Sequence, residues 1–261
     1  MGARATSLEP GRRARVSRVG VILAVIAALS TACGSQSAAR HTSVSRSVNC
    51  QGAGFLAVAA IRDRSARRVL RVAARYLRDH GVVAVLDRHS SCAKLEAFAY
   101  APKDHWTVII WPGYFNGTEI PLAHALARGL DTTVVSSHEY EEEYWTLSMF
   151  RGNESIDRFA SWPTYFRTRG AEGRRLSREW RGHPDRVARA VGLPIRVIAR
   201  YLVPRAHGKA FPDDQFPRDN FWVFTDLWRR MGIMYPERGN RYVAVLRVGD
   251  NFLDKLPATE L

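Results

Sequence analysis

The sequence predicts an α+β domain, in which an antiparallel β-meander is flanked by helices and the C-terminal part is mainly helical. Two observations lead to this class. Short β-like segments follow one another through the middle of the chain, and segments around them carry apolar residues at helical spacing. A meander with interspersed helices is typical of α+β folds.

Residues 62–81 predict the first helix of this domain. Asp63 or Ser65 suits its start and Gly81 its end. One face would be apolar, and the other would carry six arginines, which suits either solvent or an anionic lipid surface. The apolar positions are Ala66, Val69, Leu70, Ala73, Tyr76 and Leu77, and the basic positions are Arg64, Arg67, Arg68, Arg71, Arg75 and Arg78.

The next 80 or so residues predict most of the sheet, interrupted by one helix. We expect this helix over 117–131, with Gly129 as a stop and Asp131 in a turn. A turn at 151–153 joins the last two strands. The strands are expected over 82–86, 94–101, 106–111, 132–140, 142–150 and 155–161.

The C-terminal part predicts helices separated by loops. A charged, turn-rich stretch near 167–183 resembles a linker and is the place where the domain would subdivide. Helical segments are expected over 184–203 and 221–235, with a loop over 206–220 and a strand over 241–248.

The beginning of the chain predicts export. The apolar run Val19–Leu29 would rise about 16 Å as a helix, too little for a hydrocarbon core of about 30 Å. A basic segment before it and small residues after it describe a secretory signal. The basic residues are Arg12, Arg13, Arg15 and Arg18, and the small residues are Ser30, Thr31 and Ala32, followed by Cys33.

This end of the signal resembles the lipobox of bacterial lipoproteins. The resemblance implies that Cys33 carries acyl chains, palmitate among them, and becomes the first residue of the mature chain. Ser30 stands where the family usually has leucine. Ordinary secretory cleavage after Ala32, which leaves Cys33 as a plain thiol, and an uncleaved segment are the alternatives.

The chain is therefore expected to have three parts. Residues 1–32 form the signal peptide, residues 33–49 a flexible tether, and residues 50–261 a single domain. The sixteen residues 34–49, which follow Cys33, would span about 22 Å root-mean-square as a flexible chain. The tether would hold the domain clear of a headgroup layer.

Besides Cys33, the chain has two cysteines, Cys50 and Cys92. In an oxidising compartment they would form a disulfide that stabilises the fold by about 3–4 kcal/mol. Two unpaired buried cysteines are the alternative. The sequence has no Cys-x-x-Cys motif, so zinc-ribbon and thioredoxin-like sites are excluded.

The net positive charge of the chain favours anionic partners. The net charge is +14, of which the signal peptide accounts for +4, so about +10 remains on the mature chain. Anionic lipid, acidic wall polymers and nucleic acid all suit such a chain. Arginine-rich codon usage explains the same composition without any partner.

Residues 185–202 are similar to helix-turn-helix motifs. A small residue, a turn glycine and an apolar residue stand at Ala188, Gly192 and Ile198. Arg196 and Arg200 would then contact nucleic acid. Export argues against this interpretation, and two packed helices joined by a turn explain the same pattern.

Acidic residues predict one further candidate site. His138, Glu139, Glu141 and Glu142 are clustered, but they lack the spacing of calcium loops and of the helical zinc motif. A solvated turn between strands, or pairing with the many arginines, explains them more simply. Asp213, Asp214 and Asp219 are candidate carboxylates for hydrolysis, or belong to a surface loop. Nucleophile-elbow and phosphate-loop motifs are absent, so no cofactor, metal or catalytic residue is assigned.

Together these features predict a cell-envelope lipoprotein, anchored to the outer face of the cell membrane through Cys33 and having a non-enzymatic binding or structural role. Its partner is membrane lipid, with anionic lipid or wall polymer as further candidates and nucleic acid not expected. A secreted location is the alternative. A cytosolic helix-turn-helix protein and an envelope hydrolase with an acidic site are the alternative functions.

Overall fold

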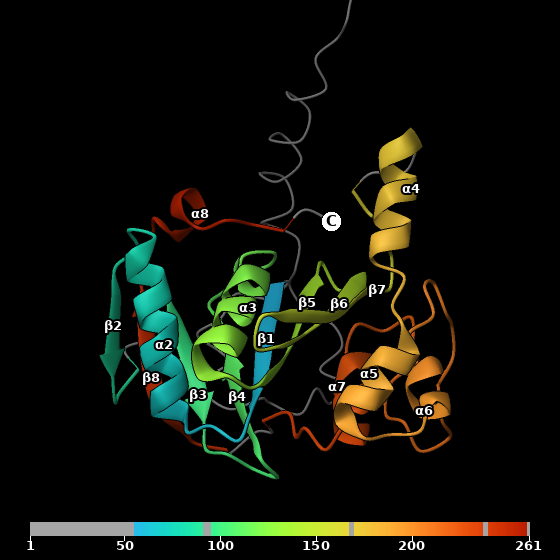
Figure 1. Ribbon diagram of the computed structural model, residues 1–261, viewed down its shortest axis with the longest axis horizontal. Coiled ribbons are helices and arrows are strands. Elements are labelled where there is room, and N and C mark those ends of the chain that lie inside the picture. The colour runs from blue at the N-terminus through green and yellow to red at the C-terminus, as the bar shows by residue number, and fades with distance from the viewer. Residues whose placement is uncertain (1–54, 91–94, 167–169, 237–239, 260–261) are drawn as a thin grey trace, which may run out of the picture. The chain divides into compact units, whose positions relative to one another are not determined.

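The computed structural model describes residues 55–90, 95–166, 170–236 and 240–259, all of which belong to one compact unit (Figure 1). They form an eight-stranded antiparallel sheet and seven helices. This confirms the predicted α+β class. The predicted signal peptide, the tether, Cys33, Cys50 and Cys92 lie outside the described residues.

The sheet has the strand order β2-β8-β3-β4-β1-β5-β6-β7, and every neighbouring pair is antiparallel. Strands β5, β6 and β7 form a meander, as predicted. The other strands do not follow chain order, because β1 lies between β4 and β5 and β8 lies between β2 and β3. The strands are β1 Phe55–Arg62, β2 Ala84–Asp87, β3 Glu96–Tyr100, β4 Trp106–Ile110, β5 Thr133–Tyr140, β6 Tyr144–Arg151, β7 Glu154–Ala160 and β8 Tyr242–Val248.

Strand β1 is central to the sheet, yet no strand or helix is expected there from the sequence. Its residues from Ala57 to Ile61 are all buried, because helices cover both faces of the sheet. A strand that is buried on both faces has no alternation of polar and apolar residues. Ala59 pairs with Ile109 of β4 on one side and with Ser136 of β5 on the other.

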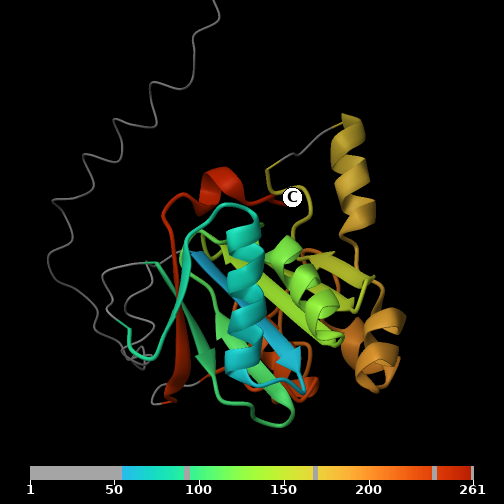
Figure 2. The same ribbon diagram turned by 60° about the vertical axis from the view of Figure 1, so that its left-hand side comes forward.

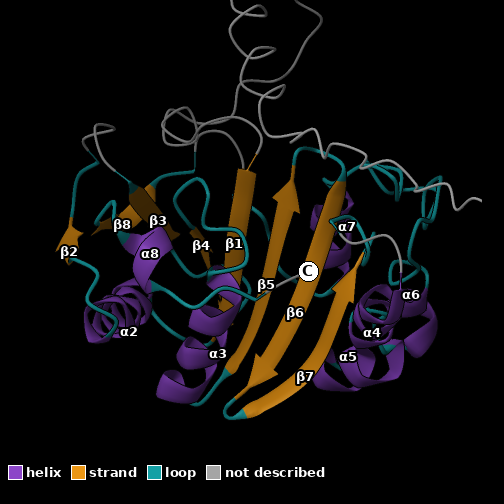
Figure 3. Cartoon of the chain, turned by 90° about the horizontal axis from the view of Figure 1, so that it is seen from above, coloured by secondary structure: helices purple, strands orange, loops and turns teal. Residues whose placement is uncertain are grey.

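Helices cover both faces of the sheet (Figure 3). Side chains from α2, α3, α4 and α8 pack on the face that contains Ala57 and Ala59. Side chains from α5, α6 and α7 pack on the face that contains Val58 and Ala60. The helices are α2 Ala66–Asp79, α3 Glu119–Leu130, α4 Gly170–Glu179, α5 Pro184–Val191, α6 Ile195–Ala199, α7 Val223–Arg230 and α8 Phe252–Lys255.

Helices α2 and α3 pack against each other across one face of the sheet (Figure 2). All six apolar positions predicted for α2 are buried or half-buried. Gly129 was expected to stop α3, but the helix continues to Leu130 and ends with Asp131 at a φ of 48°. A Cβ at Gly129 would lie 3.0 Å from Val72 of α2, so this glycine allows the close approach of the two helices.

Part of the stretch expected to be linker-like is helical, since α4 falls within it. Its turns show the mixed charge of a solvated helix: Arg175 pairs with both Glu172 and Glu179. This helix has two buried residues, Gly173 and Leu176, and its weak apolar pattern explains why the sequence reads as a loop. None of the described helices is long and apolar enough to cross a bilayer.

Candidate functional site

A cleft lies where the tip of the β5–β6 hairpin meets the loop between α6 and α7. It consists of two cavities, of about 260 Å³ and about 280 Å³, that share Asp219. We call this the hairpin–loop cleft. The first cavity is lined by Glu143, Trp145, Ser161, Trp162, Arg205, Ala206, His207, Arg218 and Asp219, and the second by Glu142, Pro217, Asp219, Asn220 and Phe221.

The hairpin tip contributes the acidic side of the cleft. Glu141 and Glu142 both have positive φ, 50° and 60°, and the amide of Glu143 donates to the carbonyl of Tyr140 at 3.0 Å. These are the φ signs of a type I′ turn, which normally uses Asn or Gly. The carboxylate of Glu139 accepts a hydrogen bond from the amide of Glu142 at 3.0 Å and thereby holds the strained tip. Glu142 and Glu143 consequently face different cavities.

Arg205 and Trp162 form the aromatic wall. The guanidinium of Arg205 lies 4.6 Å from the centre of the Trp162 ring, within the range of a cation–π interaction. The amide of Arg205 donates to the carbonyl of Ser161 at 2.8 Å, and its φ is 55°. The loop therefore reaches the end of β7 in a conformation that L-residues rarely adopt, which fixes where the Arg205 side chain begins.

Arg218 stabilises the backbone of the loop between α6 and α7 through hydrogen bonds. Its guanidinium donates to three backbone carbonyls, those of His207 at 2.6 Å, Gly208 at 3.1 Å and Arg200 at 3.1 Å. Carbonyl partners satisfy the donors but do not neutralise the charge. Arg218 thus keeps a net positive charge at the cleft.

His207 and Asp219 face each other across the cleft loop. The Nδ1 of His207 lies 3.0 Å from a carboxylate oxygen of Asp219. This hydrogen bond lowers the pKa of Asp219, so the carboxylate is charged at neutral pH. The cleft thereby offers fixed cations, fixed carboxylates and an aromatic ring, which together suit a ligand with both hydroxyl and acidic groups.

The predicted acidic site is split by the alternation of β5. His138 lies on the α3 face, where its Nδ1 is 2.6 Å from the Glu119 carboxylate, and both side chains are buried. Glu139 is buried near Tyr235 on the opposite face, and burial raises its pKa. Glu141 is exposed and lies 3.3 Å from the Tyr165 hydroxyl. Of the predicted set, Glu142 is the one that lines the cleft.

The two arginines predicted to contact nucleic acid have different environments. Helix α6 has five residues, and Arg196 on it is exposed. Arg200 donates to the carbonyl of Ala210 at 3.2 Å and lies 4.6 Å from the centre of the Phe211 ring. Arg200 therefore supports the cleft loop, and the structure does not present the pair on a long recognition helix.

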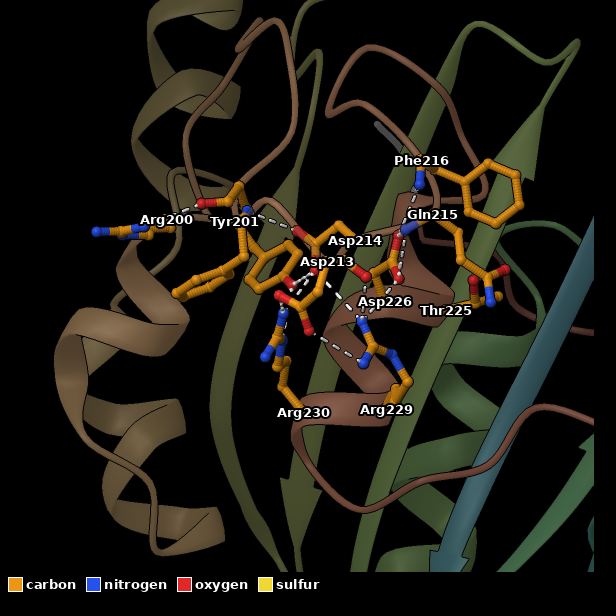
Figure 4. A network of polar contacts seen from close by, with 12 residues as sticks. Arg200, Tyr201, Asp213, Asp214, Gln215, Phe216, Thr225, Asp226, Arg229 and Arg230 are labelled. Atoms are coloured by element: carbon orange, nitrogen blue, oxygen red, sulfur yellow. Dashed lines mark hydrogen bonds and ion pairs between the residues drawn. The ribbon is translucent and has the colours of Figure 1, made fainter.

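Two of the predicted hydrolytic carboxylates, Asp213 and Asp214, belong to a polar network that holds the other half of this loop (Figure 4). Asp214 is buried and accepts from the Tyr201 hydroxyl at 2.7 Å, the Phe211 amide at 2.8 Å and Arg230 at 3.0 Å. Asp226 accepts from the amides of Gln215 and Phe216, both at 2.9 Å. These contacts assign the network a structural role, and Asp219 alone of the three aspartates reaches the cleft.

Arg205 and Arg218 were not predicted from the sequence, since each lies in a loop with no motif around it. Glu143 directly follows the predicted acidic residues but was not assigned to their site. The one sequence feature that pointed to Arg218 is that the 206–220 loop combines charges of both signs with glycine and proline. Within the described ranges, no group of three or more His, Cys, Asp or Glu side chains is placed to hold a metal ion. Comparisons with models of protein families, with curated proteins and with solved structures find no match to this chain.

Proposed function

We propose that this chain is an exported, lipid-anchored protein of the bacterial cell envelope, and that its hairpin–loop cleft binds an acidic, hydroxyl-rich unit of an envelope polymer. The anchoring half rests on the signal that ends at Cys33. The binding half rests on the cleft, where charges of both signs surround an aromatic ring. The excess positive charge of the mature chain favours the same class of partner.

One observation carries the binding half: three separate segments converge on one cleft, and three of its charged side chains, those of Arg205, Arg218 and Asp219, each have a partner within the protein. Arg218 is fixed by three carbonyls, Asp219 by His207, and Arg205 by the ring of Trp162. Side chains that are fixed before a ligand arrives lose little freedom on binding. Each cavity volume lies just below the usual range for ligand sites, and each cavity suits one sugar-sized unit.

A binding role accounts for these residues better than hydrolysis. His138 and Glu139 lie on opposite faces of β5, and Asp214 is enclosed by its structural partners. Neither predicted set therefore brings two of its own carboxylates to the cleft. Glu142 and Asp219, one from each set, line the same cavity, where their carboxylates fit hydrogen bonds to hydroxyl groups.

Anchoring is tested by the Cys33→Ala variant expressed in the native envelope. We expect this variant either to appear in the medium or to remain unprocessed, while the wild-type chain fractionates with membranes. Unchanged membrane association at unchanged electrophoretic mobility would contradict the anchoring half.

Binding is tested by co-sedimentation of the protein with purified, insoluble envelope polymer. We expect Arg205→Ala and Asp219→Asn each to weaken retention by about fivefold or more, because each removes one charged contact, worth about 1 kcal/mol or more. Arg189→Ala is the matched control, since this exposed arginine lies on α5 outside the cleft. Equal retention of all three variants and the wild type would refute the cleft as the binding site.

A further inference from the structure

We propose that the outer face of α2 is a docking surface that lays the domain against anionic lipid headgroups. The choice of lipid as the partner rests on the proposed anchoring at the membrane. The docking surface itself rests on residues of α2, and we call these five residues the arginine stripe. They are Arg67, Arg68, Arg71, Arg75 and Arg78.

The helical repeat places the stripe on one side of α2. Arg67, Arg71 and Arg75 follow one another at intervals of four residues, and Arg78 follows three later, so their side chains lie in a row. The row extends over the eleven residue steps from Arg67 to Arg78, which is about 16 Å of helix. All five arginines are exposed, while the opposite side of the helix is buried in the core.

The stripe lacks the acidic partners that other helices of this protein have. None of its five guanidinium groups forms an ion pair with a carboxylate of the residues that the structure describes, and Arg78 donates a hydrogen bond to the carbonyl of Ala84 at 3.1 Å. Asp79, at the end, is the one acidic residue of α2. In α4, by contrast, Arg175 pairs with two glutamates of its own helix. An arginine-rich composition alone does not explain this difference, because both helices share that composition.

The stripe arginines repel one another, since several of them stand three or four residues apart. Like charges at these spacings destabilise an isolated helix. An anionic surface would relieve that repulsion, which favours an external partner for this face.

A flat lipid surface fits the stripe better than a nucleic-acid groove. Helix α2 packs along its length against α3 and against strands β2 and β8 (Figure 2). A helix that enters the major groove must protrude from its domain, since the groove is about 12 Å wide. α2 lies on the sheet with α3 beside it and does not protrude, so its outer face is suited to lie on a surface.

The test measures binding of the full chain to phosphatidylcholine vesicles, with and without about one-third phosphatidylglycerol. A stripe variant and a control variant each replace four exposed arginines by glutamine and so lose the same charge. The stripe variant carries Arg67→Gln, Arg68→Gln, Arg71→Gln and Arg75→Gln, and the control carries Arg174→Gln, Arg178→Gln, Arg186→Gln and Arg196→Gln on α4, α5 and α6.

We expect the stripe variant to bind anionic vesicles at least about tenfold more weakly than the wild type, since each arginine near such a surface contributes about fivefold. The control variant should lose far less, and the wild-type affinity should fall as salt is added. The three proteins should bind neutral vesicles with equal affinity, because all of them carry the same N-terminal segment.

Equal losses in the stripe and control variants would overturn the proposal, because net charge would then explain the binding. Equal binding of the wild type and the stripe variant would overturn it as well. A stripe-dependent affinity for duplex DNA that exceeds the affinity for anionic vesicles would assign the surface to nucleic acid instead. Cys33 acylation is absent from all of these samples, so failure of the anchoring proposal leaves this result unchanged.

Discussion

Glu142 occupies a backbone conformation that suits glycine better than glutamate, with a φ of 60° at the tip of the acidic hairpin. A non-glycine residue in this region costs about 1–2 kcal/mol, part of which glycine returns through its freedom in the unfolded chain. We therefore predict that Glu142→Gly raises the free energy of unfolding by about 0.5–1 kcal/mol. Urea denaturation of the variant and the wild type measures this difference.

Two matched variants separate backbone strain from charge. Glu142→Ala removes the same carboxylate but keeps a Cβ at positive φ, so it should show no such gain. Glu143→Gly changes a neighbour outside the left-handed region and should destabilise the protein slightly. A gain in Glu142→Ala as large as that in Glu142→Gly would show that charge repulsion, and not the backbone, is relieved.

We expect the stability of the protein to depend on pH through the carboxyl group of Glu139, which lies beside the hairpin tip. Its pKa is raised, mainly because burial disfavours the charged carboxylate, so the folded state holds its proton to higher pH than the unfolded state. Between the ordinary pKa of about 4.3 and the raised value, the folded state binds more protons, and stability falls as pH rises through this window. We predict that the wild type loses more stability over this window than Glu139→Gln does.

The glutamine at position 139 keeps an oxygen that can accept from the Glu142 amide, so the comparison isolates titration from the loss of a hydrogen bond. The measurement is the difference in free energy of unfolding between the two proteins from pH 4 upward, over about three units. Parallel curves for the two proteins would contradict a raised pKa at Glu139.

At the scale of elements, the network around Asp214 ties the 206–220 loop to α6 and α7 (Figure 4). Removing its buried carboxylate leaves the Tyr201 hydroxyl and the Phe211 amide without their acceptor. We predict that Asp214→Ala lowers the free energy of unfolding by about 2–3 kcal/mol. Thermal or urea unfolding measures this loss.

Asp213 is the matched control for Asp214. It pairs with the same arginines but its side chain is 58% exposed, and exposed ion pairs contribute about 0–1 kcal/mol. Asp213→Ala should therefore destabilise the protein by less than about 1 kcal/mol. Equal losses at the two positions would show that burial does not decide the contribution of this network.

Repulsion between like charges destabilises helix α2. Several pairs within the arginine stripe stand three or four residues apart, and each such like-charge pair costs about 0.2–0.5 kcal/mol. The four-glutamine stripe variant should therefore be more stable than the wild type by about 0.5–1 kcal/mol in low salt, with the gain shrinking as salt rises. The α4–α6 control variant should show no comparable gain; if its gain is equal, overall charge and not the stripe is responsible.

The elements that the sequence predicts well are those with one buried and one solvated side. Helix α2 shows this pattern, with Val69 and Leu70 buried and Arg71 exposed. Strand β1 has no such contrast, because Ala57 to Ile61 are buried on both faces, and its position depends on helices far along the chain. Helix α4 was not predicted for the opposite reason: only two of its residues are buried, so its sequence has a weak apolar pattern.

The candidate site was less predictable than the fold, because it forms at the scale of the whole molecule. Glu143, Trp162 and Arg205 lie on three segments that meet after the sheet and the 206–220 loop are in place. No residue spacing in the sequence predicts that these three segments come together. The acidic run was a correct signal for Glu142, but the alternation of β5 sends His138 and Glu139 into opposite cores.

For the whole molecule, anchoring would concentrate both surfaces at one membrane. An acylated Cys33 would confine the domain to the reach of its expected tether, about 22 Å root-mean-square. The arginine stripe would then orient α2 toward the headgroups. The cleft would meet its polymer near the membrane surface, so that weak contacts at each surface reinforce one another.

Intact mass spectrometry of the protein extracted from membranes tests the anchoring claim most directly. We predict a chain that begins at Cys33, carries the added mass of acyl groups and lacks two hydrogens because Cys50 and Cys92 are joined. A native chain that retains Met1 and carries no acyl group would contradict the account.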